Sequence, residues 1–262
     1  MQTIQAIPAL QDNYIWMIKH AQRKQAIVVD PGCATAVLEA LNTQELTLTD
    51  ILITHHHLDH TAGIQSLLQH FPNANLYTPF PDNESINPRQ QQVQEEHHLS
   101  FWDQALSLKV MAVPGHTLDH IAFVNDQLLF CGDTLFSSGC GRLFEGSYQQ
   151  LFESLQRLAQ LPRETAVFCT HEYTRANLAF AMTVEPTNKA IQEKQSWVDE
   201  RLKNKQPSLP SSINNELDTN PFLRTNHPDV ISAASDYTGT TLQHPVEVFK
   251  ALRQWKDHFL PK

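Results

Sequence analysis

A cluster of histidines with one aspartate is the feature of this sequence best suited to chemistry. Residues 54–60 read THHHLDH, so four imidazoles and a carboxylate lie within six residues. Imidazole nitrogen and carboxylate oxygen are the usual ligands of zinc and similar divalent ions. The cluster follows a buried-looking strand, where several adjacent imidazoles would be costly to bury without partners. The pattern therefore predicts a metal site rather than a solvated polar loop.

Three later positions repeat this arrangement at the ends of predicted strands. His116, Asp133 and His171 each follow an apolar run and precede a small, hydroxyl or acidic residue. Strand ends on one rim of a sheet are where α/β proteins gather their sites. The set is too large for one tetrahedral ion with an open position and suits two ions that share a bridge. The candidate ligands are His55, His57, Asp59, His60, His116, Asp133 and His171.

The spacing inside the cluster suggests which side chains cooperate. Residues two apart in an extended segment point the same way, so His55 and His57 can share an ion. Asp59 and His60 lie past the turn and can reach a second position. His56 is expected to point away from these neighbours, and His120 to support the ligands from behind. The pair His97 and His98 follows two glutamates and is expected at the surface.

The elements around these residues change character along the chain. Strands are predicted at 25–29, 50–54, 106–113, 120–124, 127–130 and 165–170, and helices at 34–41, 62–70 and 148–161. Beyond residue 172 the sequence offers no convincing strand, and helices are predicted at 174–182, 188–205, 211–218 and 245–259. The change predicts a mixed α/β catalytic domain, 1–171, and a helical domain, 172–262.

Composition excludes several classes of function. With 262 residues, 41% of them hydrophobic, the chain has material for a sizeable core. A net charge of −9 without a basic stripe argues against nucleic acid as a partner. No run approaches the roughly 18 apolar residues of a membrane span, and residues 1–5 do not resemble a signal peptide. We expect a cytoplasmic monomer, with Cys33, Cys131, Cys140 and Cys169 as reduced thiols.

The ligand set resembles that of the metallo-β-lactamase superfamily. His55-x-His57-x-Asp59-His60 has that superfamily's signature, and His116, Asp133 and His171 follow in the expected order. The resemblance implies an αββα sandwich with the metals at one edge. It also implies that His55, His57 and His116 hold the first metal, that Asp59, His60 and His171 hold the second, and that Asp133 bridges them. The expected cofactors are two divalent ions, Zn²⁺ first, with iron or manganese as alternatives.

Metals of this kind would supply hydroxide at neutral pH beside a polarised carbonyl. Asp59 could orient that hydroxide. A thioester suits such a site, because a thiol leaving group of pKa roughly 8.5 to 9 needs little acid catalysis. The metal chemistry alone does not choose thioesters over lactams, lactones or phosphodiesters.

The rest of the chain closely resembles the glyoxalase II (hydroxyacylglutathione hydrolase) family. The matching segments are 11–14 (QDNY), 139–146 (GCGRLFEG), 170–174 (THEYT), 220–224 (NPFLR) and 253–256 (RQWK). The resemblance implies hydrolysis of S-(2-hydroxyacyl)glutathione, chiefly S-D-lactoylglutathione, in the second step of methylglyoxal detoxification. It implies glutathione contacts from Arg142, Tyr173, Arg253 and Lys256. Phe144 is a departure, since some members of the family carry tyrosine there.

Four alternatives differ in class. A glutathione persulfide dioxygenase of the same superfamily would share the amino-terminal part but lack the long helical C-terminal domain. A β-lactamase is disfavoured because residues 1–5 do not resemble an export signal. A nuclease is disfavoured because the chain has a net negative charge, which repels nucleic acid. A metal-storing scaffold would have no need of the basic pair in the last helix, Arg253 and Lys256.

The last helix carries the first testable prediction. Phe249, Leu252, Trp255 and Phe259 form an apolar stripe, and Lys256 lies within its arc with Arg253 beside it. Replacing both cations by alanine should raise KM for the glutathione thioester much more than it lowers kcat. Steady-state kinetics would measure this, and an unchanged KM would contradict the binding role.

Overall fold

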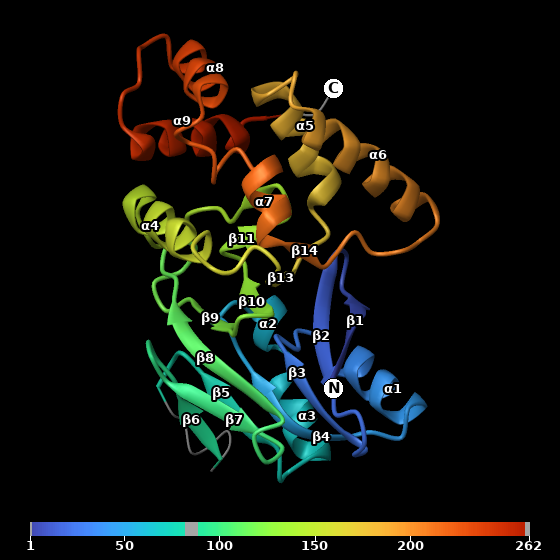
Figure 1. The fold of residues 1–262 in the computed structure, drawn as a ribbon. Coiled ribbons are helices and arrows are strands. Elements are labelled where there is room, and N and C mark those ends of the chain that lie inside the picture. Colours follow the sequence, from blue (N-terminus) through green and yellow to red (C-terminus); the bar gives the residue numbers. More distant parts are fainter. Residues whose placement is uncertain (1, 82–88, 260–262) are drawn as a thin grey trace. The chain divides into compact units, whose positions relative to one another are not determined.

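The structure is a computed structural model that describes residues 2–81 and 89–259 (Figure 1). The chain divides into two compact units. The first unit comprises the described residues up to Ala112 together with Asp119–Gly132. The second unit comprises Val113–Leu118 and the described residues from Asp133 onward. The catalytic and helical domains expected on either side of residue 172 stay a prediction.

The first unit contains a six-stranded mixed sheet, in the order β1-β2-β3-β4-β5-β6. Strands β1 to β3 are antiparallel neighbours and β3 to β6 are parallel ones. The strands are β1 Thr3–Ala9, β2 Asn13–Lys19, β3 Gln25–Val29, β4 Thr47–Leu52, β5 Asn75–Thr78 and β6 Gln90–Gln92. The helices of this unit are α1 Ala34–Thr43, α2 Leu58–Thr61 and α3 Ile64–His70.

Both faces of this sheet are buried, which explains why its central strands are apolar at consecutive positions. In β3, Ala26 and Val28 belong to a core cluster that also contains Val37 and Leu41 of α1 and Leu67 of α3. The alternate residues of β3 face the other way and are buried too. Strand ends such as that of β4 are thereby held rigidly, which matters for the side chains that follow them.

The first unit also contains an antiparallel meander, β7 His98–Phe101, β8 Leu106–Ala112, β9 Ile121–Val124 and β10 Leu128–Gly132. The predicted hairpin turn between β9 and β10 is confirmed. The side-chain oxygen of Asn125 accepts hydrogen bonds from the backbone amides of Gln127 and Leu128, each at 2.9 Å. Tyr77 of β5 meets Phe101 of β7 edge-on, with ring centroids 5.7 Å apart.

The second unit begins with short strands and one amphipathic helix. They are β11 Leu135–Phe136, β12 Gly139–Cys140, α4 Tyr148–Leu158 and β13 Ala166–Cys169. Helix α4 starts at a capping box formed by Ser147 and Gln150, and it buries Leu151, Leu155 and Leu158 at helical spacing. The predicted helix at 148–161 is therefore correct in type and ends at Leu158.

Helices make up most of the remainder of the second unit. They are α5 Thr174–Val184, α6 Lys189–Lys203, α7 Ile213–Thr219, α8 Pro228–Thr238 and α9 Pro245–Asp257. Phe180 of α5 is fully buried and packs against Phe222 and Trp255. Phe249 of α9 packs against Phe222 and against Phe152 of α4. This aromatic cluster ties α9, which carries Arg253 and Lys256, to α4 and α5.

Two sequence expectations fail in this part of the chain. Residues 211–218 were expected to be helical throughout, but Ser211–Ser212 forms the short strand β14, antiparallel to β13. The expectation of no strand beyond residue 172 is wrong for the same reason. The hydroxyl of Ser212 then caps α7, and this preference of serine for the N-cap places the helix start at Ile213. Helix α8 was not anticipated.

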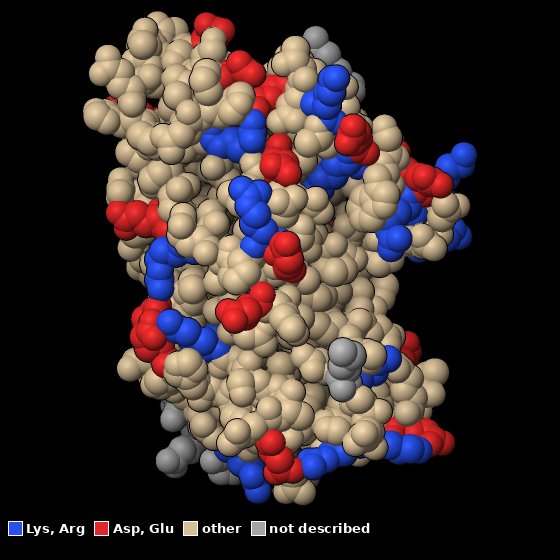
Figure 2. Space-filling model, in the orientation of Figure 1, with Lys and Arg blue, Asp and Glu red and all other residues tan. Residues whose placement is uncertain are grey.

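The surface shows both signs of charge. Figure 2 shows cationic and anionic side chains interspersed over the face drawn, without a continuous basic band among the described residues there. Within residues 2–81 and 89–259, no helix is both long and apolar enough to cross a bilayer.

Candidate metal centre

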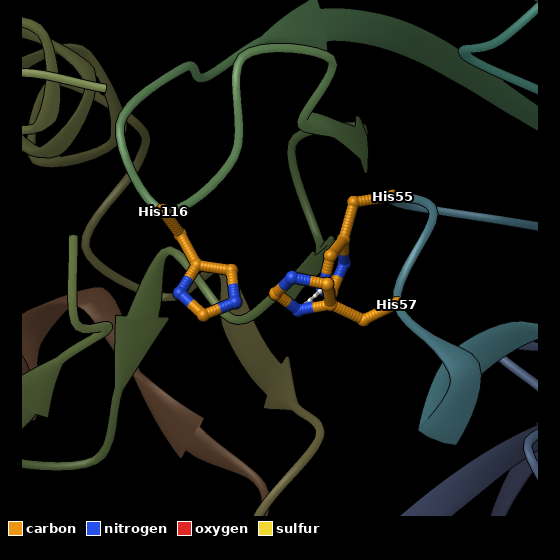
Figure 3. A group of neighbouring side chains, drawn as sticks. All are labelled: His55, His57 and His116. Carbon is orange, nitrogen blue, oxygen red and sulfur yellow. Dashed lines mark hydrogen bonds between the residues drawn. The ribbon is translucent and has the colours of Figure 1, made fainter. Parts of the chain in front are cut away.

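The first group of predicted ligands lies in the segment that follows β4. His55 is fully buried, and its Nε2 lies 3.1 Å from Nδ1 of His57. The two rings approach at 4.7 Å, and Figure 3 shows their nitrogens facing each other across the dashed line. The third side chain drawn there, His116, belongs to the second unit. The prediction that His55 and His57 point the same way is confirmed by this contact.

A buried carboxylate beneath this segment orients two of the imidazoles. Asp30, at the end of β3, accepts from the amide and the hydroxyl of Thr54, both at 2.8 Å. The hydroxyl proton is thereby used, so Thr54 Oγ1 accepts from His55 Nδ1 at 3.1 Å. Asp30 Oδ2 also lies 3.1 Å from Nδ1 of His60. The Thr54 hydroxyl favours a proton on Nδ1 of His55, and the Asp30 charge favours one on Nδ1 of His60, so Nε2 is the nitrogen of each ring that would bind a cation.

Asp59 and His60 lie on the short helix α2, past the turn. Asp59 Oδ2 is 3.6 Å from His60 Nε2 and accepts a hydrogen bond from the side-chain amide of Asn13 at 3.2 Å. The backbone of Asp59 packs on Gly32, where a Cβ would lie 1.7 Å from the Asp59 carbonyl oxygen. Glycine is therefore required at position 32 for α2 to approach the end of β3.

The neighbouring histidines behave as the sequence suggested. His56 is exposed and pairs with Asp119 at 3.0 Å, turned away from the ligand candidates. His120 is buried, and its ring stacks on that of His55 with centroids 4.5 Å apart. His97 and His98 are exposed. These positions fit a supporting role for His120 and a surface position for the other three.

The second group of predicted ligands lies in the second unit. Asp133 Oδ2 is 3.3 Å from His171 Nε2 and 3.6 Å from His116 Nε2, and all three side chains are buried. His116 Nδ1 donates to the carbonyl of Arg142 at 2.8 Å, which leaves its Nε2 lone pair on the side of Asp133. One carboxylate oxygen is thus placed between two imidazole nitrogens.

Gly115 allows this position of His116. Its φ is +150°, and a Cβ there would lie 2.5 Å from Cβ of Leu151 in α4. Any side chain would push the 113–118 segment off α4 and displace His116 with it.

The spacing in both units fits coordination of a divalent ion. A tetrahedral site with zinc–nitrogen bonds of 2.0–2.1 Å separates its ligand atoms by about 3.3 Å. The contacts within the first unit measure 3.1 and 3.6 Å, and those within the second 3.3 and 3.6 Å. Each of the seven predicted ligands belongs to a group of side chains that could hold a metal ion. The donor set therefore fits divalent metal.

The four predicted glutathione contacts lie in the second unit. Tyr173 is partly exposed and stacks on His171 at 4.7 Å with an interplanar angle of 3°. Arg142 is exposed, 3.7 Å from Asp257. Lys256 donates to the carbonyl of Ala176 at 2.9 Å. Burial, with the neighbouring Arg253 charge, lowers the pKa of Lys256 to about 8.

Arg253 differs from the expected ligand-facing cation. Its side chain is buried, donating to the Cys140 carbonyl at 2.9 Å and to Asp257 at 3.0 Å. Only its Nε is left buried without a partner in the described structure. The guanidinium therefore holds β12 against α9, and only its remaining N–H groups, including Nε–H, would serve a ligand.

Phe144, the departure from the family pattern, is 66% exposed and meets the His116 ring edge-on at 5.1 Å. An apolar ring thus replaces a hydroxyl next to a predicted ligand.

Sequence reasoning missed the residues that orient the ligands. Asp30 was interpreted only as part of a turn, 30–32, and Asn13 only as part of a family motif. The available signal was an acid directly after a buried apolar strand, since such a carboxylate needs hydrogen-bond donors. The long-range partners of Asp30 could not be named from the sequence.

Comparison with known proteins places this fold and site in a class. The model of the metallo-β-lactamase superfamily matches residues 10–171. A solved metallo-β-lactamase from Staphylococcus aureus is similar in fold, with a TM-score of 0.63 at 18% identity, covering 97% of this chain and 72% of that one. The chain belongs to the metallo-β-lactamase superfamily, and the predicted αββα sandwich is confirmed.

More specific matches cover the whole chain. The model of the hydroxyacylglutathione hydrolase C-terminus matches residues 172–259. A hydroxyacylglutathione hydrolase from Psychromonas ingrahamii is 48% identical over 99% of this chain and 100% of its own length. Another from Aeromonas salmonicida is 46% identical over the same shares. The chain belongs to the hydroxyacylglutathione hydrolase family, as its motifs predicted.

The Asp30 network yields a prediction about metal affinity. Asp30→Asn keeps the shape of the side chain but removes the charge that favours protons on Nδ1 of His55 and His60. Affinity for divalent metal should fall roughly 10- to 100-fold, as for other residues that support ligands. Metal retained after dialysis against graded chelator measures this. Asp126→Asn in the β9–β10 turn is the control, and equal retention by the two variants would contradict the role given to Asp30.

Proposed function

We propose that this protein hydrolyses S-(2-hydroxyacyl)glutathione thioesters, chiefly S-D-lactoylglutathione, to the hydroxy acid and glutathione. Its full-length relatives carry the name hydroxyacylglutathione hydrolase, and the C-terminal model of that family matches the helical part of the chain. The observation that carries the chemistry is the placement of Asp133 Oδ2 between His116 and His171. A carboxylate oxygen shared by two imidazoles is what a bridging ligand between two ions requires.

The ligand assignment is part of this proposal. His55, His57 and His116 hold one ion, Asp59, His60 and His171 hold the other, and Asp133 bridges them. Zinc is the proposed metal, with iron or manganese as alternatives, because histidine and carboxylate ligands accept all three. Ions bound here would act as Lewis acids that lower the pKa of coordinated water and polarise a thioester carbonyl.

The chain's own residues orient the reactants. Asp30 and Thr54 favour the tautomer of His55 that would bind an ion through Nε2, and the Arg142 carbonyl does the same for His116. Asp59 would accept a hydrogen bond from the attacking water or hydroxide and thereby fix its direction of attack. No separate acid is needed, because the leaving thiolate is the conjugate base of a thiol with pKa roughly 8.5.

Recognition of glutathione is assigned to Arg142, Tyr173, Arg253 and Lys256. Glutathione carries two carboxylates, which cationic side chains attract. Arg142 is exposed and Lys256 is half-buried over the aromatic rings of Phe180 and Phe259. Arg253 contributes its remaining Nε donor and otherwise keeps β12 and α9 in place. Tyr173 supports His171 by stacking and offers its partly exposed ring to the peptide.

The dioxygenase alternative is disfavoured by the C-terminal part of the chain. The family model for the hydrolase C-terminus matches residues 172–259, the segment that persulfide dioxygenases of this superfamily are expected to lack. We also propose action in the cytoplasm as a monomer, which agrees with four cysteines that form no disulfide in the described structure.

The function is tested with purified protein and S-D-lactoylglutathione. We expect release of glutathione thiol in proportion to enzyme, with two divalent ions per chain measured on the same sample and activity lost on removing them. Oxygen uptake with glutathione persulfide, without thioester cleavage, would instead establish the dioxygenase.

The pKa of Lys256 gives a pH prediction. A lysine with pKa about 8 is charged below that pH and neutral above it, so attraction for a carboxylate is lost as pH rises through 8. The kcat/KM of the unmodified protein should fall roughly fivefold as the pH rises above about 8. This factor is the expected contribution of a partly screened hydrogen bond between charged groups. The Lys256→Met variant should have a low kcat/KM already at pH 7, and its kcat/KM should not fall further as the pH rises.

Lys250→Met, an exposed lysine on the same helix, is the matched control and should keep the wild-type profile. Single replacement of Lys256 is cleaner than the double alanine variant, because Arg253 also holds Cys140 and Asp257. An alkaline limb that persists in Lys256→Met would refute the assignment.

A further inference from the structure

We propose that Asn13 is a positioning residue for the hydrolysis, acting through the carboxylate of Asp59. The proposal rests on the function given above and adds a residue to which no role has been assigned. Asn13 would hold Asp59 at the angle from which it binds metal and orients the nucleophile. Its removal should therefore change turnover and metal binding more than substrate affinity.

The register of the first hairpin aims Asn13 inward. Ala9 pairs with Asn13 across β1 and β2, so Asn13 is the first residue of β2 after the turn. Side chains alternate along a strand, which puts Asn13 on the same face as Ile15 and Met17. Those two residues belong to the core cluster beneath the sheet. Asn13 is only 5% exposed, although Leu10 in the adjoining turn is 59% exposed.

A buried primary amide needs a polar partner, because desolvating it without one is costly in free energy. Asn13 has that partner in Asp59, whose Oδ2 accepts from the amide Nδ2 at 3.2 Å. The same Oδ2 lies 3.6 Å from His60 Nε2. The amide therefore reaches a carboxylate oxygen that already stands beside a predicted ligand.

The hydrogen bond from Asn13 restrains the side chain of Asp59. Its backbone is fixed by close packing on Gly32, but its side chain is 38% exposed. Loss of the amide would remove a hydrogen bond from the same Oδ2 that stands beside His60. The hydrogen bond from a rigid strand end therefore favours the rotamer that faces His60.

The identity of residue 13 also matters. An amide donates to a carboxylate without adding charge, whereas an acid at this position would repel Asp59. The next residue of the strand, Tyr14, points to the opposite face, so a slip of one residue in the hairpin register would remove the donor.

Three variants test the proposal: Asn13→Ala, Asn13→Asp and the control Gln11→Ala in the adjoining turn. For Asn13→Ala we expect kcat for S-D-lactoylglutathione to fall roughly 10- to 100-fold with KM within about twofold. Retention of the second ion against chelator should fall in parallel. Asn13→Asp, which preserves size but adds repulsion, should lose at least as much. Gln11→Ala should match the wild type in both measurements.

Thermal unfolding of each variant separates positioning from folding. If Asn13→Ala does not fold, the isosteric Asn13→Asp decides the matter. Wild-type kcat and metal retention in a folded Asn13→Asp or Asn13→Ala would overturn the proposal. Metal retention can be measured without the substrate. If the wild-type protein failed to cleave the thioester, the proposed function would be wrong, but the effect of Asn13 on metal retention could still be interpreted.

Discussion

The site depends on one constraint: each coordinating imidazole must be neutral and must turn its lone pair toward the ion. A histidine in water meets neither condition reliably, because it rotates and protonates near neutral pH. Here the protein supplies an acceptor for the opposite nitrogen. Thr54, polarised by Asp30, accepts from His55, and the Arg142 carbonyl accepts from His116. Each acceptor fixes a proton and a ring orientation with a single contact.

The rigidity of those acceptors comes from the fold. Asp30 ends a strand buried on both faces, and Arg142 follows a strand that Arg253 holds from α9. Glycines remove the side chains that would keep these pieces apart, at Gly32 beneath α2 and at Gly115 against α4. Buried charged side chains and close backbone contacts thus hold the predicted ligands, which lie at the ends of helices and strands.

The local sequence pattern was enough to predict the helices and strands that have a clear hydrophobic period or a strong boundary signal. The run QAIVV before Asp-Pro-Gly is β3, and the leucines of α4 follow a serine cap. Strands β1 and β2 were missed because β1 mixes polar and apolar residues and the apolar run of β2 lacks a period that separates strand from helix. Helix α8 begins at Pro228 and ends at Thr238, directly before Gly239, which are boundary signals typical of a helix.

Residue type and order were enough to nominate the ligands, and the structure shows ligand-like spacing within each unit. Residue type and order were not enough to identify the residues that orient the ligands. Asp30 meets Thr54 and His60, 24 and 30 positions along the chain, and Asn13 meets Asp59, 46 positions along the chain. The position of Arg253 on its helix predicts a cation that faces substrate, whereas tertiary packing also gives it two protein partners. Such contacts exist only once the strands are paired.

The central claim is that seven side chains hold two divalent ions with Asp133 common to both. Crystals of the metal-loaded protein, measured at wavelengths on either side of the metal absorption edge, test it directly. The account predicts two anomalous peaks, one beside His55, His57 and His116 and the other beside Asp59, His60 and His171, with an Asp133 oxygen at bonding distance from each. A single peak, or two peaks that do not share Asp133, would contradict it.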